Sequence, residues 1–139
     1  MPPQLSGVRH TLKKREVLKS KQQIKELFDR GSTFFLYPYK VFFKFVPEVS
    51  SPANFLISVS KKNFRRAVDR NIIRRRIRES YRLNKHLLIR ELSKGTSISA
   101  AYIYIGKSIL PFEEINNKLK EVLLRLINVE VHKTDNKHE

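Results

Sequence analysis

The segment from Ser58 to Arg82 contains ten basic side chains and only two acidic ones, Asp69 and Glu79. When it is drawn as a helix at about 100° per residue, most of its arginines gather on one side and an apolar stripe lies on another. The basic side holds Ala67, Asn71, Arg74, Arg75, Arg78 and Arg82, and the stripe holds Ile73, Ile77 and Tyr81. Because guanidinium groups bind phosphate oxygens in pairs and stack on bases, this pattern favours a polyphosphate ligand.

A simpler interpretation is a charged helix whose cations only face water. Solvated helix faces usually mix both signs, with Glu and Lys placed four residues apart. Acidic residues are scarce in this segment. The scarcity weakens the solvated-face interpretation and strengthens the case for an anionic partner.

The charge of the whole chain is concentrated in its middle. The 139 residues carry a formal net charge of +16, of which residues 1–60 contribute +6, residues 61–90 contribute +10 and residues 91–139 contribute none. This length is typical of one compact domain. Because like charges destabilise a compact chain unless a polyanion neutralises them, we expect the balanced C-terminal segment to pack away from the partner.

Groupings typical of catalysis are missing from the sequence. The four histidines, at positions 10, 86, 132 and 138, are far from one another and from paired carboxylates at ligand spacing. No nucleophile accompanies a base, and the four glycines form no phosphate loop. We therefore expect no catalytic residue, no metal ligand and no cofactor in the protein itself.

The sequence also lacks the features of an exported or membrane protein. It has no cysteine and no apolar run near the length of about 20 residues that spans a bilayer. Its first twenty residues are charged and lack the apolar core of a secretory signal. We expect a cytoplasmic, unprocessed chain without a membrane partner.

The chain divides into an arm, one domain and a tail. Residues 1–18 are basic without periodicity, which predicts a flexible arm, and residues 131–139 are predicted to be a polar tail. The domain between them, residues 19–130, begins with a helix near residues 20–30, bracketed by the Ser20 and Gln23 capping pattern and by Gly31.

An aromatic run over residues 33–46 is predicted to form two strands divided by Pro38. From Tyr39 onward the side chains alternate, so that Lys40, Phe42 and Lys44 share one face. An aromatic ring between two cations is typical of surfaces that stack single-stranded nucleic acid. An exposed strand with one isolated aromatic residue is the alternative.

The remaining pattern predicts an α+β protein. A strand is expected over residues 54–60, the basic helix over 66–82, a break at Asn84, a short helical piece over 86–92, a strand over 98–105 and an amphipathic helix after Pro111. The order α-β-β-β-α-β-α predicts a single-domain, two-layer sandwich with one four-stranded sheet.

The residues around the basic helix carry a family resemblance. Arg70-Asn71, Arg74-Arg75 and Arg78-Glu79, preceded by residues 58–62 and by Ala67-Val68, resemble the arginine-asparagine-arginine motif of the protein subunit of bacterial ribonuclease P. The resemblance runs from about residue 18 to about residue 126 and includes the first helix, the aromatic strand and the closing helix.

The resemblance implies an accessory subunit of an endoribonuclease. In that family the holoenzyme removes the 5′ leader of precursor tRNA, the catalytic part is an RNA with divalent metal such as Mg²⁺, and the protein binds both the catalytic RNA and the leader. The implied contacts to the catalytic RNA are Arg66, Arg70, Asn71, Arg74, Arg75 and Arg78. The implied leader-binding cleft contains Ile24, Phe28, Lys40, Phe42, Lys44, Ser58, Lys61 and Lys62. A left-handed β-α-β crossover is also implied, although such crossovers are rare in general.

Three positions depart from the family pattern. Ile24 stands where many members have an aromatic residue in the cleft, which removes base stacking there. Ile72 replaces a residue that is usually basic, and Lys107 after Gly106 keeps a charge but not the guanidinium fork. We expect these changes to affect leader and RNA affinity rather than the fold.

Two other interpretations remain at this point. A ribosomal or other structural RNA-binding protein would share the charge and the predicted sandwich, but would not stimulate cleavage of precursor tRNA. A basic amphipathic helix could also bind anionic membranes. The apolar side of this helix lacks Trp and is expected to be used by the core.

Overall fold

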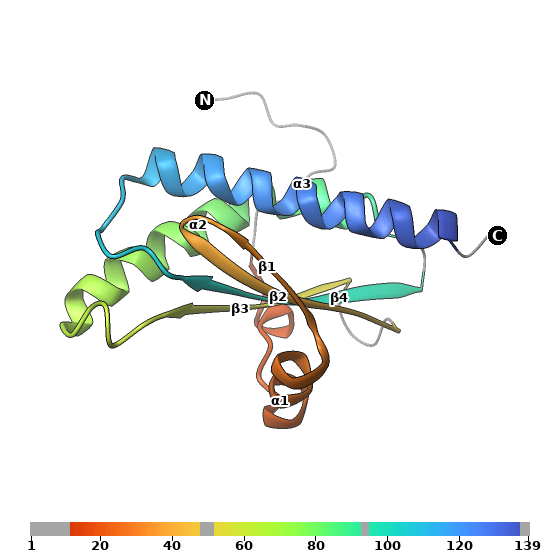
Figure 1. Cartoon of the computed structure of the whole chain (residues 1–139), viewed down its shortest axis with the longest axis horizontal. Coiled ribbons are helices and arrows are strands. Elements are labelled where there is room, and N and C mark those ends of the chain that lie inside the picture. Colours follow the sequence, from red (N-terminus) through yellow and green to blue (C-terminus); the bar gives the residue numbers. More distant parts are fainter. Residues whose placement is uncertain (1–11, 48–51, 93–94, 137–139) are drawn as a thin grey trace.

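The computed structural model describes residues 12–47, 52–92 and 95–136 (Figure 1). In chain order the elements are the 3-10 helix η1 (Lys14–Glu16), α1 (Lys21–Arg30), β1 (Ser32–Leu36), β2 (Tyr39–Pro47), β3 (Ala53–Val59), α2 (Ala67–Ile89), β4 (Thr96–Tyr104) and α3 (Phe112–Asn136). The predicted α+β class and the order of the main elements are confirmed.

The four strands form one mixed sheet in the order β1-β2-β4-β3. The β1–β2 and β2–β4 pairs are antiparallel, whereas β3 and β4 are parallel neighbours. Parallel neighbours require a crossover connection, and α2 provides it. The family resemblance implies that this crossover is left-handed.

Helices α2 and α3 cover one face of the sheet, and α1 lies against the opposite face (Figure 1). The main core lies under α2 and α3, where β2 contributes Tyr39, Val41 and Phe43. A smaller apolar cluster under α1 joins Leu27 to Ala101 of β4. The alternation of β2 is therefore the reason why the sheet has two different surfaces.

The first helix begins and ends where the sequence predicts. The Ser20 hydroxyl accepts a hydrogen bond from the Gln23 amide at 3.3 Å, which caps the N-terminus of α1. At the other end the Gly31 amide donates to the Leu27 carbonyl at 2.9 Å. A side chain at Gly31 would collide with that carbonyl, so the position requires glycine because of a close approach.

The break predicted at Asn84 is wrong, because α2 continues without interruption to Ile89. Asn84 is buried, and its side-chain amide donates to the Ser80 carbonyl at 2.7 Å and to Asn116 Oδ1 of α3 at 2.8 Å. Asparagine favours helix ends because it competes for backbone hydrogen bonds. Here that capacity is used inside the helix, where it joins α2 to α3.

The flexible arm predicted over residues 1–18 is wrong for residues 12–18. Residues 1–11 lie outside the described part, but the Leu18 amide donates to the Phe55 carbonyl at 2.8 Å. The Glu16 carboxylate forms an ion pair with Lys85 at 2.6 Å, and these side chains are only 7% and 10% exposed. Residues 12–18 are thus part of the folded unit, and α3 likewise extends to Asn136, past the start of the predicted tail.

The loop between β3 and α2 is held from both ends. The Ser60 hydroxyl accepts hydrogen bonds from the amides of Lys62 and Asn63. From within α2, Nη1 of Arg70 donates to the carbonyl oxygens of Phe64 at 2.7 Å and of Arg65 at 2.9 Å. These contacts fix the backbone that carries the exposed lysines of the loop.

Replacing Lys85 with Met leaves the buried Glu16 carboxylate without its counter-charge. Loss of one partner of a buried ion pair is expected to lower the free energy of unfolding by about 3–5 kcal/mol. Urea unfolding followed by circular dichroism measures this change. The double replacement Glu16→Leu with Lys85→Met removes both charges and is expected to recover most of the loss. A single-variant loss below about 1 kcal/mol would contradict the role given to this pair.

Replacing Arg70 with Lys removes the planar group that reaches two carbonyl oxygens at once. We expect a loss of about 1–3 kcal/mol in the free energy of unfolding, together with faster trypsin cleavage in the loop over residues 61–66. Arg75→Lys is the matched control, because Arg75 is an exposed arginine of the same helix. Equal stability and equal cleavage rates in the two variants would show that Arg70 does not hold the loop.

Candidate nucleic-acid interface

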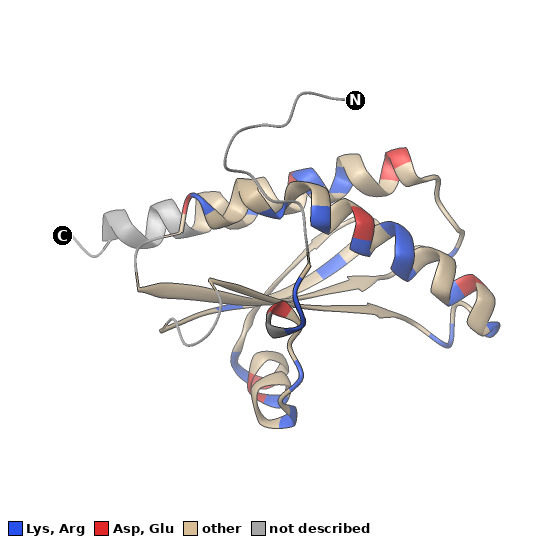
Figure 2. Ribbon diagram, turned by 180° about the vertical axis from the view of Figure 1, so that it is seen from behind, with Lys and Arg blue, Asp and Glu red and all other residues tan. Residues whose placement is uncertain are grey.

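Helix α2 presents its cations to solvent because its apolar stripe fixes its rotation. Ile73, Ile77 and Tyr81 are fully buried in the main core, as the helical pattern predicts. Asn71, Arg75 and Arg78 are exposed on the helix, and Figure 2 shows basic residues recurring along α2 and on α1. The exposed members of this row are available to a ligand that approaches the outer side of α2.

Other motif residues are engaged within the protein. Arg70 holds the preceding loop, and Nη1 of Arg74 donates to Asn71 Oδ1 at 3.3 Å. Nη1 of Arg76 donates to the Leu110 carbonyl at 2.6 Å, which ties the segment before α3 to α2. The arginines of α2 therefore divide into a set that supports the structure and a set that faces solvent.

Arg82 belongs to the supporting set. Its guanidinium pairs with Glu79 one turn earlier at 2.5 Å, and this hydrogen bond holds the pKa of the Glu79 carboxyl below its usual range. The acid therefore stays ionised and offsets one cation at the C-terminal end of the basic row. Arg66, the N-cap residue of α2, is exposed at the other end. The positive surface is thus centred on the first half of the helix.

The second group of predicted site residues lies on the α1 side of the sheet. Lys40, Phe42 and Lys44 of β2 share this face. The Phe28 ring of α1 meets the Phe42 ring edge-on, with centroids 4.7 Å apart, and Lys40 Nζ lies 5.1 Å from the Phe42 centroid. The structure therefore brings Phe28, Phe42 and Lys40 together in a solvent-accessible cluster.

Two further predicted cleft residues have structural partners. Lys44 pairs with Glu26 of α1 at 2.5 Å, and the hydrogen bond from Lys44 lowers the pKa of the Glu26 carboxyl. Ile24 packs against the small cluster formed by Leu18, Leu27 and Ala101. Both residues help to seat α1 on the sheet. Ile24 contributes an apolar contact at the position where many family members have an aromatic residue.

Ser58, Lys61 and Lys62 lie across the sheet from the aromatic cluster. The register places Lys40 beside Ile103, and Ile103 beside Ser58 of β3. Lys61 and Lys62 are exposed just beyond the end of β3. The loop that carries them leads directly into α2, so it connects the two basic regions along the chain.

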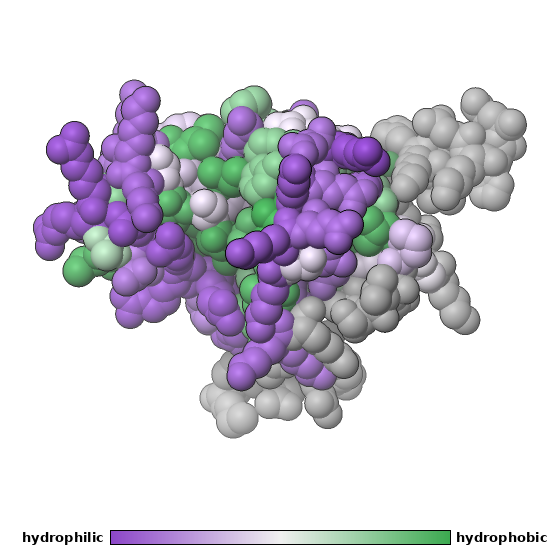
Figure 3. All heavy atoms as spheres, turned by 90° about the horizontal axis from the view of Figure 1, so that it is seen from below, coloured by the Kyte–Doolittle hydropathy of each residue, from purple (hydrophilic) through white to green (hydrophobic). Residues whose placement is uncertain are grey.

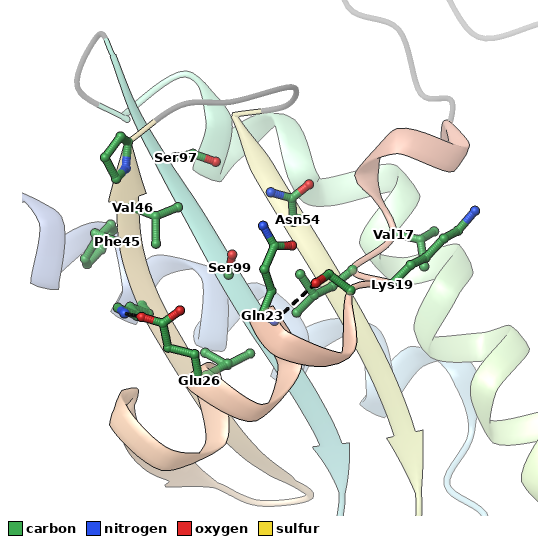
Figure 4. A pocket seen from close by; sticks show the side chains of 14 residues that line it. Val17, Lys19, Gln23, Glu26, Phe45, Val46, Asn54, Ser97 and Ser99 are labelled. Carbon is green, nitrogen blue, oxygen red and sulfur yellow. Dashed lines mark hydrogen bonds and ion pairs between the residues drawn. The ribbon is translucent and has the colours of Figure 1, made fainter.

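A cavity of about 530 Å³ lies next to the N-terminal end of α1 (Figure 4). Its lining includes Gln23, Asn54, Ser97 and Ser99, and Gln23 projects from α1 towards Asn54 (Figure 4). Sequence reasoning missed these polar residues. The alternation of side chains in β4 could have indicated the two serines, because Ser97, Ser99 and Ala101 lie on the face that Phe42 occupies in β2.

The same face combines polar and apolar surface. Seen from below, hydrophilic side chains gather in separate groups with hydrophobic surface between them (Figure 3). A chain that carries alternating phosphates and bases requires this mixture of cations and exposed rings. The arrangement fits a single-stranded polyanion better than a purely apolar ligand.

Metal-binding side chains do not gather into a site in the part of the chain that the structure describes. There, no three His, Asp or Glu side chains lie close enough together to hold a metal ion. Burial raises the pKa values of the Tyr81 and Tyr102 hydroxyls. These two tyrosines stay protonated at neutral pH and belong to the core.

No described helix is long and apolar enough to cross a bilayer.

The fold is shared with solved structures of ribonuclease P proteins. The protein from Thermotoga maritima superposes with a TM-score of 0.63 at 24% identity, covering 80% of this chain and 97% of that chain. The protein from Staphylococcus aureus superposes with a TM-score of 0.60 at 25% identity, covering 86% of this chain and 95% of that chain. Both likenesses agree with the mixed sheet and its covering helices.

Sequence comparison extends the likeness from fold to family. The ribonuclease P protein component of Porphyromonas gingivalis is 34% identical over 117 residues, covering 83% of this chain and 85% of the relative. That of Chlorobium phaeobacteroides is 35% identical over 132 residues, covering 86% and 90%. The sequence model of the family described as Ribonuclease P matches residues 12–127. The chain therefore belongs to the ribonuclease P protein family.

Proposed function

We propose that this protein is the RNA-binding subunit of a ribonuclease P ribonucleoprotein, which removes the 5′ leader of precursor tRNA by endonucleolytic cleavage. The observation that carries the proposal is the pairing of an exposed arginine row on α2 with a solvent-accessible cluster of rings and a cation beside α1. Family membership supports assigning these two surfaces to ribonuclease P.

In this proposal α2 binds the catalytic RNA. Arg75 and Arg78 are exposed, and Arg66 stands at the start of the same helix. Guanidinium groups on a rigid helix contact phosphate oxygens with little loss of side-chain freedom per hydrogen bond. Arg70 contributes by holding the loop, and Arg74 and Asn71 add an exposed hydrogen-bonded pair to the same row. The expected effect is tighter, salt-dependent binding of RNA.

The α1 side of the sheet binds the leader. A single strand crossing this face stacks bases on Phe28 and Phe42 and places phosphates near Lys40 and Lys44. Lys61 and Lys62 extend the positive surface past Ser58 towards α2. Stacking on a phenyl ring tolerates every base, because every base has a flat π-face.

The reaction itself belongs to the RNA partner. Hydrolysis of a phosphodiester requires an activated water and stabilisation of the leaving oxygen, tasks suited to Mg²⁺ held by the catalytic RNA. The protein contributes by neutralising phosphate repulsion and by positioning the leader, so that substrate affinity rises at a given magnesium concentration. We expect the assembly to act in the cytoplasm.

The direct test is reconstitution with a bacterial ribonuclease P RNA. Cleavage of precursor tRNA is measured at low and high Mg²⁺, with and without the protein. We expect the protein to accelerate cleavage most at low Mg²⁺, because phosphate neutralisation then has the largest effect. Equal rates with and without the protein, combined with tight binding to ribosomal RNA, would instead support a structural RNA-binding protein.

The assignment of α2 is tested by the double replacement of Arg75 and Arg78 with Ala. Binding of the catalytic RNA is measured between about 50 and 200 mM salt, where each lost phosphate contact lowers the slope of log affinity against log salt by roughly 0.7–0.9. We expect the slope to fall by roughly 1.4–1.8, which corresponds to two contacts. The control replaces Lys118 and Lys120 of α3, which are also exposed. An unchanged slope in the α2 variant would refute the assignment.

A further inference from the structure

A phenylalanine outside the predicted cleft is exposed beside it. Phe35 lies on β1, an edge strand of the sheet, and its side chain is 60% exposed. Among the described residues, neither of the two hydrophobic clusters includes Phe35. A large exposed ring that the core does not use is an unusual surface feature when it stands next to other rings and a cation.

Lys40 joins Phe35 to the cluster under α1. The β1–β2 register places Phe35 directly opposite Lys40. Lys40 Nζ lies 5.3 Å from the Phe35 ring centroid and 5.1 Å from the Phe42 ring centroid. The Phe42 ring in turn contacts Phe28. Pairwise contacts therefore connect the four side chains from α1 to the edge strand β1, and the ammonium group lies within 5.3 Å of both the Phe35 and the Phe42 ring centroids.

The opposite face of β1 holds the strand in place. The neighbouring Phe34 is buried in the main core, and the Arg125 guanidinium of α3 lies 4.5 Å from its ring centroid. Arg125 Nη1 also donates a long hydrogen bond of 3.5 Å to the Phe35 carbonyl. Because side chains alternate along a strand, anchoring Phe34 inward turns the Phe35 ring outward on the α1 side.

We propose that Phe35 and Lys40 form an additional subsite for one nucleotide of single-stranded RNA at the β1 edge. A base stacks on the exposed ring of Phe35, and its phosphate pairs with Lys40. The subsite rests on the proposed function, because it takes the tRNA leader as its ligand and lengthens the leader's path. The register row from Ser58 through Ile103 and Lys40 to Phe35 crosses all four strands. It spans roughly 14 Å at the usual spacing between strands.

The chemistry of this surface favours RNA over a protein partner. The exposed ring stands beside a cation in a chain of net charge +16, which suits a ligand that alternates flat bases with negative charges. A phenyl ring has no donor or acceptor groups, so the subsite does not select a particular base. It distinguishes leaders by whether they are long enough to reach β1.

The experiment uses the reconstituted holoenzyme and precursor tRNAs whose leaders lengthen by one nucleotide at a time. For the unmodified protein we expect affinity to increase stepwise, with a final step when the leader reaches β1. Phe35→Ala is expected to remove that step alone and to lower affinity for long leaders by about fivefold to a hundredfold, the range for loss of one stacked base. Phe35→Trp is expected to retain the step, and Phe35→Leu to lose it.

Two further variants make the result interpretable. Tyr37→Ala is the matched control, because Tyr37 has the same 60% exposure but lines a groove with α3 residues such as Glu114. Phe28→Ala removes a ring of the proposed cleft and is expected to weaken binding of short and long leaders alike.

The outcomes separate the subsite from the proposed function. If Phe28→Ala weakens leader binding while Phe35→Ala matches the unmodified protein at every leader length, the subsite is overturned and the cleft remains. If neither variant affects leader binding, both are overturned. Equal losses in Phe35→Ala and Tyr37→Ala, or a loss of affinity for mature tRNA in Phe35→Ala, would also overturn the subsite.

Discussion

The strict alternation of β2 is the constraint on which the rest of the structure depends. Consecutive side chains must point to opposite faces of a sheet. Phe43 therefore enters the core under α2 and α3, while Phe42 next to it faces α1. A shift of one residue in the register would exchange the two faces and bury Lys40 and Lys44 in the main core. The ladder with β4 and the small cluster under α1 both oppose this shift.

Burial of one side of α2 likewise determines where its charged side chains lie. The apolar stripe of α2 is buried in the core, so the arginines of this helix lie on its outer side. Several of them are then used internally, as Arg70 and Arg76 show through their bonds to backbone carbonyl oxygens. A guanidinium group suits both uses, because its planar donors reach two acceptors whether these are carbonyl or phosphate oxygens. The motif thus stabilises the structure, in addition to the RNA contact that we propose for it.

Sequence reasoning predicted what local periodicity determines. The stripe of Ile73, Ile77 and Tyr81 and the shared face of Lys40 and Phe42 follow from the repeat of a helix and of a strand. Contacts between distant segments could not be predicted in this way. Asparagine favours helix ends, so the sequence alone indicates an end at Asn84. The side chain that it contacts inside the helix pair, Asn116, lies 32 positions away and leaves no local signal. The sequence around Glu16 likewise indicates a flexible arm, because the partner that holds Glu16 in place, Lys85, lies 69 positions away.

The attachment of the N-terminal segment has a consequence for synthesis of the protein. Leu18 is bonded to β3, Glu16 is paired with α2, and the cluster under α1 also needs Ala101 of β4. A ribosome makes the chain from its N-terminus at roughly 5–20 residues per second, so α1 emerges seconds before β4. The α1 side of the sheet is therefore completed late, when β4 joins the sheet. Until then the apolar cluster under α1 is incomplete, and a nascent chain presents the basic residues of α1 before this helix has its full docking surface.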